Sequence, residues 1–322
     1  LAADEREVYL TFQVHNESIV IPETIDCIRA LTGLETDGSR SMAKTDAALG
    51  VMKAFLPATT RPITHEFGPE VPHPAIEAVR AAVLDQLNAG AEVIKVIASG
   101  GVLTPGTSPD DAQMTVAELS AAVEVAVAHG RHVAAHAHGA TGMKNALRAG
   151  VHSIEHATLM DDDAAEMMTQ RHVYMVPTLS ALATTAACPT GCGIPDSARS
   201  KARNMVKQHE RSFRAALRRG VPIAMGTDAG TPFNYHGDNA QELERMVALG
   251  MTPMEAIMTS TSAAARLLGL IQDIGSIAAG KQADLLVVEG NPLRNIGVLL
   301  KRERIAGVMQ RGRFVAGPVS RA

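Results

Sequence analysis

The sequence predicts an α/β fold built on a parallel β-sheet. From residue 74 onward, short runs rich in Val, Ile and Ala alternate with longer segments in which apolar residues recur at helical spacing. The short runs are apolar throughout, as is typical of strands that are covered on both faces. Regular alternation of strand and helix is typical of a parallel sheet with helices packed against it.

The first part of this pattern contains four helix–strand pairs. We expect helices at residues 74–88, 115–129, 139–149 and 161–170, and strands at 92–98, 132–136, 152–155 and 173–176. Thr115 can cap the second helix, and Glu118 three residues later completes a capping box. Aspartates at the start of the fourth helix suit the positive end of a helix dipole.

The pattern continues towards residue 268. We expect a long polar helix at 197–219, a strand at 222–227, and helices at 239–249 and 253–268, the last opened by Thr252 and Pro253. The first 65 residues can add strands at 8–14 and near 62–64, which makes seven. A closed barrel needs eight strands, so an open doubly wound sheet stays as an alternative, although no glycine-rich nucleotide loop supports it.

The character of the sequence changes after Leu268. Short β segments are predicted at 275–280, 284–288 and 305–315, separated by glycine turns. We therefore expect a barrel domain at 1–268 and, at 269–322, the C-terminal strands of a small β domain. A sheet this short needs further strands to close its core, and we expect them to precede residue 1.

Composition limits the class of protein. The 322-residue chain is 46% hydrophobic with a net charge of −4, has 3% aromatic residues and lacks Trp, which argues against nucleic-acid binding and base stacking. It has neither a run of about 18 apolar residues nor a visible signal peptide, so we expect a cytoplasmic protein without a membrane-spanning helix. The chain begins at Leu1 and not at Met, so this expectation does not cover the native N-terminus. The three cysteines indicate a reducing compartment or incidental thiols, with Cys188 and Cys192 in a loop.

Polar residues stand out at the ends of the predicted strands. Lys95 lies within an apolar run, His136 and His138 close the next strand, His156 follows a third, and Asp228 ends a fourth. A single lysine there can extend its amine to water, and a single buried histidine is usually structural. Four strand ends that carry such groups together are harder to explain as core, because buried polar groups need partners.

These residue types suit one chemistry. Histidine nitrogens and carboxylate oxygens are the usual ligands of Zn²⁺ and similar ions. A metal with an open coordination position lets its water ionise near neutral pH. Asp228 can then act as a general base if its surroundings adjust its pKa.

Several segments together resemble the amidohydrolase superfamily, in the branch of Xaa-Pro dipeptidase-like and imidazolonepropionase-like hydrolases. They are VIKVIASGG at 93–101, AAHAHG at 134–139, SIEH at 153–156, GTDAGTP at 226–232, and the stretch 275–292 with GKQADL. The resemblance implies a (β/α)8 TIM-type barrel with a small β-sandwich built from both chain ends. It also implies one or two divalent metals, usually Zn²⁺.

The resemblance also implies residue roles. Lys95 matches a lysine that is often N-carboxylated and bridges two metals, and His136, His156 and Asp228 match metal ligands, Asp228 doubling as general base. His138 and His236 fall where substrate contacts are common. The first strand of the family normally ends in His-x-His, and here the best match is Gln13-Val14-His15. His15 is thus a further expected metal ligand, with Gln13 a weaker one.

We therefore expect a metal-dependent hydrolase that cleaves the amide bonds of dipeptides, N-acyl amino acids or related small amides. Its partners are then small-molecule substrates, and we expect a homo-oligomer. Two alternatives stay open. Gln13 favours a catalytically impaired scaffold protein with the amidohydrolase fold, and the superfamily also includes cyclic-amide hydrolases of the imidazolonepropionase type.

Overall fold

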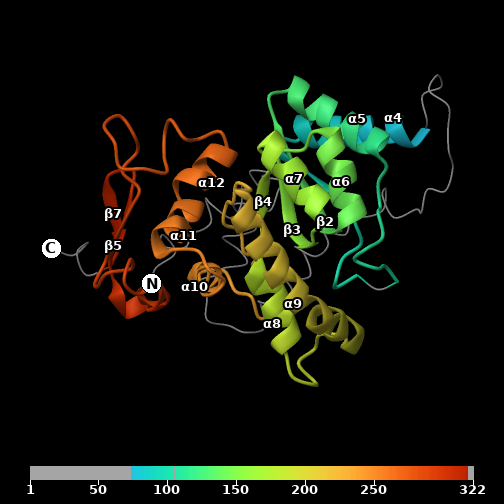
Figure 1. The fold of residues 1–322 in the computed structure, drawn as a ribbon. Coiled ribbons are helices and arrows are strands. Elements are labelled where there is room, and N and C mark those ends of the chain that lie inside the picture. Colours follow the sequence, from blue (N-terminus) through green and yellow to red (C-terminus); the bar gives the residue numbers. More distant parts are fainter. Residues whose placement is uncertain (1–73, 105, 318–322) are drawn as a thin grey trace, which may run out of the picture.

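A parallel β-sheet forms the centre of the computed structural model, which describes residues 74–104 and 106–317. Its strands are β1 (Val93–Ile97), β2 (His132–Gly139), β3 (Ser153–Leu159) and β4 (Tyr174–Val176), hydrogen-bonded in that order. The connecting helices are α4 (Pro74–Asn88), α5 (Val116–Ala128), α6 (Ala140–Ala149) and α7 (Asp162–Arg171). Figure 1 shows these four helices side by side along the sheet. The predicted parallel α/β fold is confirmed.

The main core lies between this sheet and its helices. Val133, Ile154 and Met175, from three neighbouring strands, are fully buried together with Leu119 of α5 and Met143 of α6. Burial of apolar surface contributes about 25 cal/mol per Å² and is the main stabilising term for such a layer. The predicted capping box also forms, since Thr115 and Glu118 satisfy each other's backbone N–H groups at the start of α5.

A fifth segment continues the sheet beyond β4. Ile223 forms a parallel bridge with Met175, whose N–H donates to Pro222 O (2.8 Å) and whose carbonyl accepts from Ala224 N (3.0 Å). The predicted strand at 222–227 thus lies where expected, but it is reduced to this single bridge. The strands expected before residue 65 lie outside the described residues.

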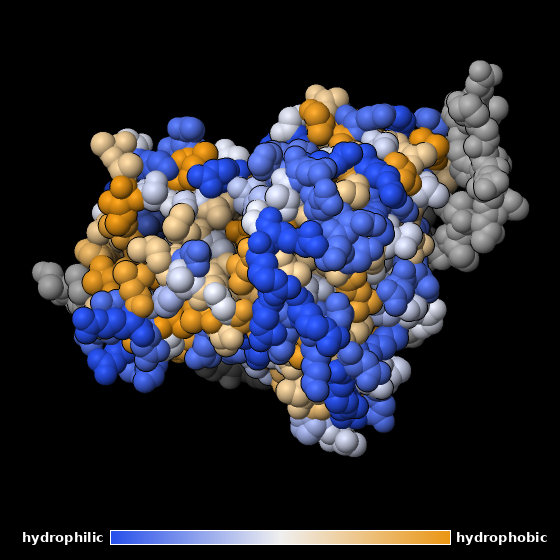
Figure 2. All heavy atoms as spheres, viewed as in Figure 1, coloured by the Kyte–Doolittle hydropathy of each residue, from blue (hydrophilic) through white to orange (hydrophobic). Residues whose placement is uncertain are grey.

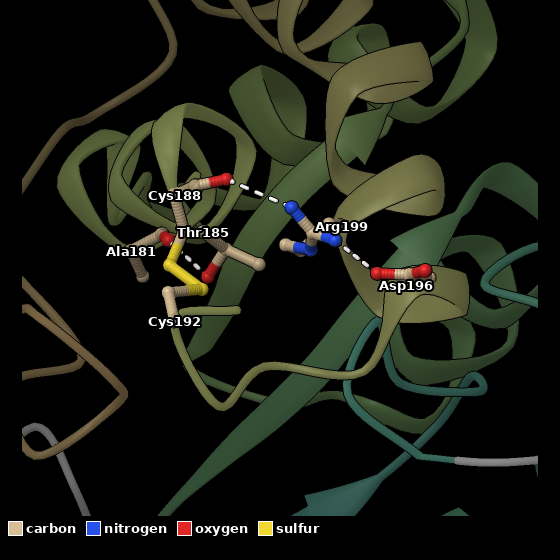
Figure 3. Close-up of a disulfide and its surroundings, with 6 residues drawn as sticks. All are labelled: Ala181, Thr185, Cys188, Cys192, Asp196 and Arg199. Carbon is tan, nitrogen blue, oxygen red and sulfur yellow. Dashed lines mark hydrogen bonds and ion pairs between the residues drawn. A yellow bond between two sulfur atoms is a disulfide. The ribbon is translucent and has the colours of Figure 1, made fainter. Parts of the chain in front are cut away.

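Helix α8 (Leu179–Ala187) was not predicted, whereas α9 (Asp196–Arg219) begins one residue before the expected helix. The loop between them contains a disulfide between Cys188 and Cys192 (Figure 3). The prediction of incidental thiols at these positions was wrong. Four residues of separation across a turn place the two Cα atoms 6.2 Å apart, which is within disulfide range. Arg199 of α9 donates to the carbonyl of Cys188 (3.2 Å).

Helix α10 (Ala240–Ala248) matches its prediction, but the helix expected at 253–268 is divided. It forms α11 (Pro253–Ser260) and α12 (Ser262–Leu267), with a break at Thr261, whose φ is −122° and ψ −96°. The carbonyl of Thr259 accepts from Met225 N (3.0 Å) and is therefore engaged by the neighbouring sheet segment. This tertiary hydrogen bond is a physical reason for the division.

A second, antiparallel sheet consists of β5 (Leu285–Val288), β6 (Ile305–Gln310) and β7 (Arg313–Ala316). The 3-10 helices η1 (Ile296–Leu300) and η2 (Arg302–Arg304) lead into β6. The strand expected at 275–280 is a series of turns. Figure 2 shows apolar residues gathered on the surface where Figure 1 places this sheet. Within the described residues, none of the helices has the length and apolar character to cross a membrane.

Candidate metal centre

Three histidine rings meet at the sheet. His136 and His138 of β2 and His156 of β3 form a triangle whose ring centroids are 4.6–4.7 Å apart. One nitrogen from each ring lies within 4.8 Å of the others. In the described part of the chain, this is the one cluster of at least three His, Cys, Asp or Glu side chains with that geometry. Imidazole nitrogens are common ligands of Zn²⁺ and related ions, so the triangle is a candidate metal centre.

A β-bulge brings the third histidine into this triangle. Ala137 pairs with His156 but Gly139 pairs with Leu159, so two steps along β2 match three along β3. His156 and Ala157 have φ values of 73° and 48°, in the left-handed region that non-glycine residues rarely adopt. An extra residue of this kind redirects the side chains around it, and here the imidazole of His156 comes to lie beside the two rings of β2.

Two threonines orient two of the three rings. Nδ1 of His138 lies 2.8 Å from Oγ1 of Thr158, and Nδ1 of His156 lies 2.6 Å from Oγ1 of Thr178. Each hydrogen bond fixes the rotation of its ring, and Nε2 is then the ring nitrogen that can coordinate a metal. Partners of this kind behind metal-binding histidines set the tautomer and the direction of the lone pair.

Helix α9 supports the bulge from behind. Nε2 of His209 donates to the carbonyl of His156 (2.9 Å), and Oγ of Ser212, one turn later, donates to the carbonyl of Thr158 (2.8 Å). Both side chains are buried. Backbone carbonyls at a bulge leave the regular hydrogen-bond ladder and need other partners when they are buried. The two side chains supply those partners.

Lys95 lies next to the triangle. It is in register with Ala134, two residues before His136, and so its side chain is on the same face of the sheet as that ring. Its positive charge acts on the carboxyl groups of Glu155 and Asp228. Burial raises the pKa of both carboxyls, and the charge of Lys95 opposes that rise. Lys95 therefore interacts electrostatically with two acidic groups.

Asp228 lies on a constrained loop that follows the fifth sheet segment. Its φ is 53°, and Nδ2 of Asn234 donates to the carbonyls of Thr227 (2.6 Å) and Asp228 (3.0 Å). A Cβ atom at Gly230 would lie 3.4 Å from Nε2 of His236, so His236 packs against the same loop. Left-handed backbone at a non-glycine residue stores about 1–3 kcal/mol, and such strain clusters at functional sites.

The electrostatics suit metal binding. Burial, followed by the charge of Lys95, lowers the pKa of His136 to about 4, and burial lowers the pKa values of His138 and His156 well below 6.5. The rings are therefore neutral at pH 7, and a cation can bind without first displacing protons from them. The donor set of three neutral imidazoles and a nearby carboxylate fits a divalent ion such as Zn²⁺.

The structure groups the rings of His136, His138 and His156, and Lys95 interacts electrostatically with all three rings and with Asp228. His138, predicted as a substrate contact, lies among rings that can bind a metal. His15 lies outside the described residues. The roles of all these residues stay predictions. Sequence reasoning missed the supporting residues Glu155, Thr158, Thr178, His209 and Asn234. Of these, Glu155 alone carried a signal, since it is a charged residue within an apolar strand.

The comparisons with known proteins identify the family of this chain. The model of the Amidohydrolase family matches residues 57–315. The chain belongs to the amidohydrolase family. The resemblance predicted from the sequence is confirmed, and with it the α/β barrel fold class.

The chain is similar to an ochratoxinase, a Xaa-Pro dipeptidase and a prolidase. The ochratoxinase of Aspergillus niger is 35% identical over 245 residues, which cover 76% of this chain and 50% of that protein. A crystal structure of a Xaa-Pro dipeptidase with bound methionine has a TM-score of 0.71 at 38% identity, covering 81% of this chain and 64% of that one. A prolidase complexed with N-methylphosphonate-L-proline has a TM-score of 0.72 at 30% identity, covering 80% and 65%. The chain thus spans about half the length of the curated ochratoxinase.

Proposed function

We propose that this chain belongs to a metal-dependent hydrolase that cleaves the amide bonds of dipeptides, N-acyl amino acids or related small amides. The observation that carries the proposal is the cluster of three neutral histidine rings, with the charge of Lys95 acting both on these rings and on the carboxyl group of Asp228. The names of the relatives, a Xaa-Pro dipeptidase, a prolidase and an ochratoxinase, support hydrolysis as the reaction class.

The metal is held by His136, His156 and Asp228 in this proposal, with His138 able to contribute a further nitrogen. When bound, a divalent ion such as Zn²⁺ polarises the substrate carbonyl and lowers the pKa of water. His15 would serve a second ion. Lys95 is a candidate for N-carboxylation, in which its neutral Nζ bonds to the carbon of CO2 and releases one proton. The resulting carbamate offers oxygen ligands.

Asp228 carries the proton in this scheme. Its carboxylate takes a proton from the attacking water and delivers it to the nitrogen of the leaving amine. Because burial raises its pKa, the carboxyl is a stronger base than a solvated aspartate, as this role requires. The hydrogen bonds from Asn234 keep the loop, and thereby the carboxylate, in one position. His138 and His236 are proposed to contact the substrate.

The reaction is tested with the full chain. The protein is freed of metal with a chelator, reloaded with Zn²⁺, and assayed against Xaa-Pro dipeptides, N-acyl amino acids and an imidazolone ring. Turnover of the first two classes that requires metal is the expected result. Turnover of the ring alone would favour the imidazolonepropionase type, and a metal-loaded protein without turnover on any of them would favour a scaffold.

Replacement of Lys95 by Ala tests the carbamate. K95A is expected to lose metal and activity together, with partial recovery in added short carboxylic acids, which can supply the missing oxygen ligands. The control is K144A, because Lys144 is a lysine that forms an ion pair with Asp161 (2.7 Å) and has no role in the proposed site. Full metal content and rate in K95A would contradict the assigned role.

A further inference from the structure

The start of helix α8 is capped in an unusual way. Thr178 is its N-cap residue, and a threonine there normally accepts a hydrogen bond from the backbone N–H of its own helix. Here Thr178 has left-handed backbone, with φ 49° and ψ 43°, and makes no side-chain cap. Its hydroxyl instead lies 2.6 Å from Nδ1 of His156. The hydroxyl that would normally cap the helix therefore forms its hydrogen bond with a histidine of the candidate metal centre.

A glutamate from a distant helix supplies the missing cap. Glu242 of α10 is completely buried, and its carboxylate accepts from the backbone N–H groups of Leu179 (2.7 Å) and Ser180 (2.8 Å). The hydroxyl of Ser180 donates to the same carboxylate (2.6 Å). Leu179 and Ser180 are the first two residues of the helix, so these are N–H groups that the helix itself leaves unsatisfied. An anion is also favoured at this end of a helix dipole.

We propose that Glu242 is a positioning residue for the metal centre: by capping α8 in place of Thr178, it leaves the Thr178 hydroxyl to orient His156. Three charge-assisted hydrogen bonds fix the two residues that follow Thr178 and so keep Thr178 in its rare backbone conformation. Glu242 therefore acts on His156 only through Thr178, because its own hydrogen bonds go to Leu179 and Ser180.

The same contact links the two parts of the proposed site. Helix α10 directly follows the loop that contains Asp228, and α8 directly follows β4 and Thr178. Glu242 therefore ties the segment behind the proposed general base to the segment that orients a proposed metal ligand. The ring of His138 is oriented by the hydroxyl of Thr158 instead, which belongs to β3 itself. The hydrogen bonds of Glu242 do not include Thr158.

The first test reads the ring of His156 without metal. In metal-free protein at pH 8, ¹⁵N-histidine NMR reports which ring nitrogen carries the proton and how strongly it is hydrogen-bonded. E242Q replaces one acceptor oxygen by an amide nitrogen, which donates and cannot accept, and we expect the His156 signals to shift while those of His138 stay in place. Unchanged His156 signals in a folded E242Q protein would overturn the proposal. If E242Q does not fold, S180A removes one donor and is expected to shift His156 in the same sense; no shift in S180A overturns the proposal.

The second test measures Zn²⁺ affinity by competition with a chelator, and this part rests on the proposed function. Loss of a partner behind a metal ligand typically costs 10- to 100-fold in affinity, and E242Q is expected to lose about that much. T178V should cause a similar loss, and the double variant should be no weaker than T178V alone, because both changes break one chain of contacts. Additive losses of Zn²⁺ affinity would contradict the proposal that Glu242 acts through Thr178.

E118Q is the matched control. Glu118 is also a buried glutamate that caps a helix N-terminus, through the N–H and hydroxyl of Thr115 (both 2.8 Å) on α5. Its substitution should lower the melting temperature to a similar extent and change Zn²⁺ affinity by less than about twofold. Equal affinity losses in E118Q and E242Q would reduce Glu242 to a general structural role. A wild-type chain that binds no Zn²⁺ would refute the proposed function, and the NMR test would still decide the role of Glu242.

Discussion

The two sheets of this chain differ in what they bury. The parallel sheet encloses polar groups, among them His138, His156 and Glu155, and each has a hydrogen-bond partner. The small antiparallel sheet exposes apolar groups instead, with Leu286, Val287 and Phe314 at 37–41% exposure. Burial of a polar group costs free energy unless the group is hydrogen-bonded. The concentration of such groups in the parallel sheet therefore points to a functional role for that sheet, in addition to its role in stability. We expect single-atom changes to matter in the first sheet and to matter little in the second.

The largest effect is expected at Asp228. D228N keeps the shape of the side chain but removes its ability to carry a proton, and kcat is expected to fall by about 10²–10⁴-fold. Steady-state kinetics on the best substrate of the panel measure this. The matched control is D238N on the same loop, where Asp238 faces Arg302 (3.6 Å) near the surface. An unchanged rate in D228N would remove Asp228 from the proton-transfer role.

A smaller effect is expected from pH on the free energy of unfolding of the metal-free protein. Burial lowers the pKa values of His136 and His209 to about 4, whereas histidines of the unfolded chain titrate near 6.5. The unfolded state therefore takes up protons first as the pH falls. These residues favour the folded state fully above about pH 6.5, and that contribution is lost as the pH falls towards 4.

Buried acids act in the opposite direction. Burial raises the pKa of Glu242 to about 7 and also raises those of Glu155 and Asp228, so the folded state binds these protons more tightly. The histidines with lowered pKa values outnumber them: His136, His138, His152, His156, His209 and His236. Urea unfolding should thus show lower stability at pH 5 than at pH 7.5. A stability that rises on acidification would contradict the burial of neutral histidines.

The smallest effect is expected on the exposed face of the small sheet. V287K places a charge on a strand position that is 40% exposed, and the free energy of unfolding should change by no more than about 0.5 kcal/mol. Zn²⁺ content should not change. A marked loss of stability, measured by urea unfolding, would show that this face is covered and that the contrast between the two sheets is weaker than described.

The sequence was sufficient to predict the parts of the site that follow from local pattern. Lys95 and His136 lie in apolar strands whose ends the strand–helix alternation locates, so their convergence is predictable. The bulge at His156 is not, because it depends on hydrogen bonds from His209 in a helix more than 50 residues later. The cap of helix α8 is unpredictable for the same reason: Thr178 is a common N-cap residue, but its hydroxyl lies against His156, and Glu242 of a distant helix caps α8 instead.

The central claim is that His136 of β2 and His156 of β3 are ligands of one metal ion. Elemental analysis after equilibration with Zn²⁺ and desalting tests it directly, on the wild-type chain and on H136A, H138A, H156A and the exposed control H129A. The account predicts at least one Zn²⁺ per wild-type chain, the same in H129A, and a clear loss in H136A and H156A, with H138A showing whether its ring is a ligand. Wild-type metal content in both H136A and H156A would contradict it.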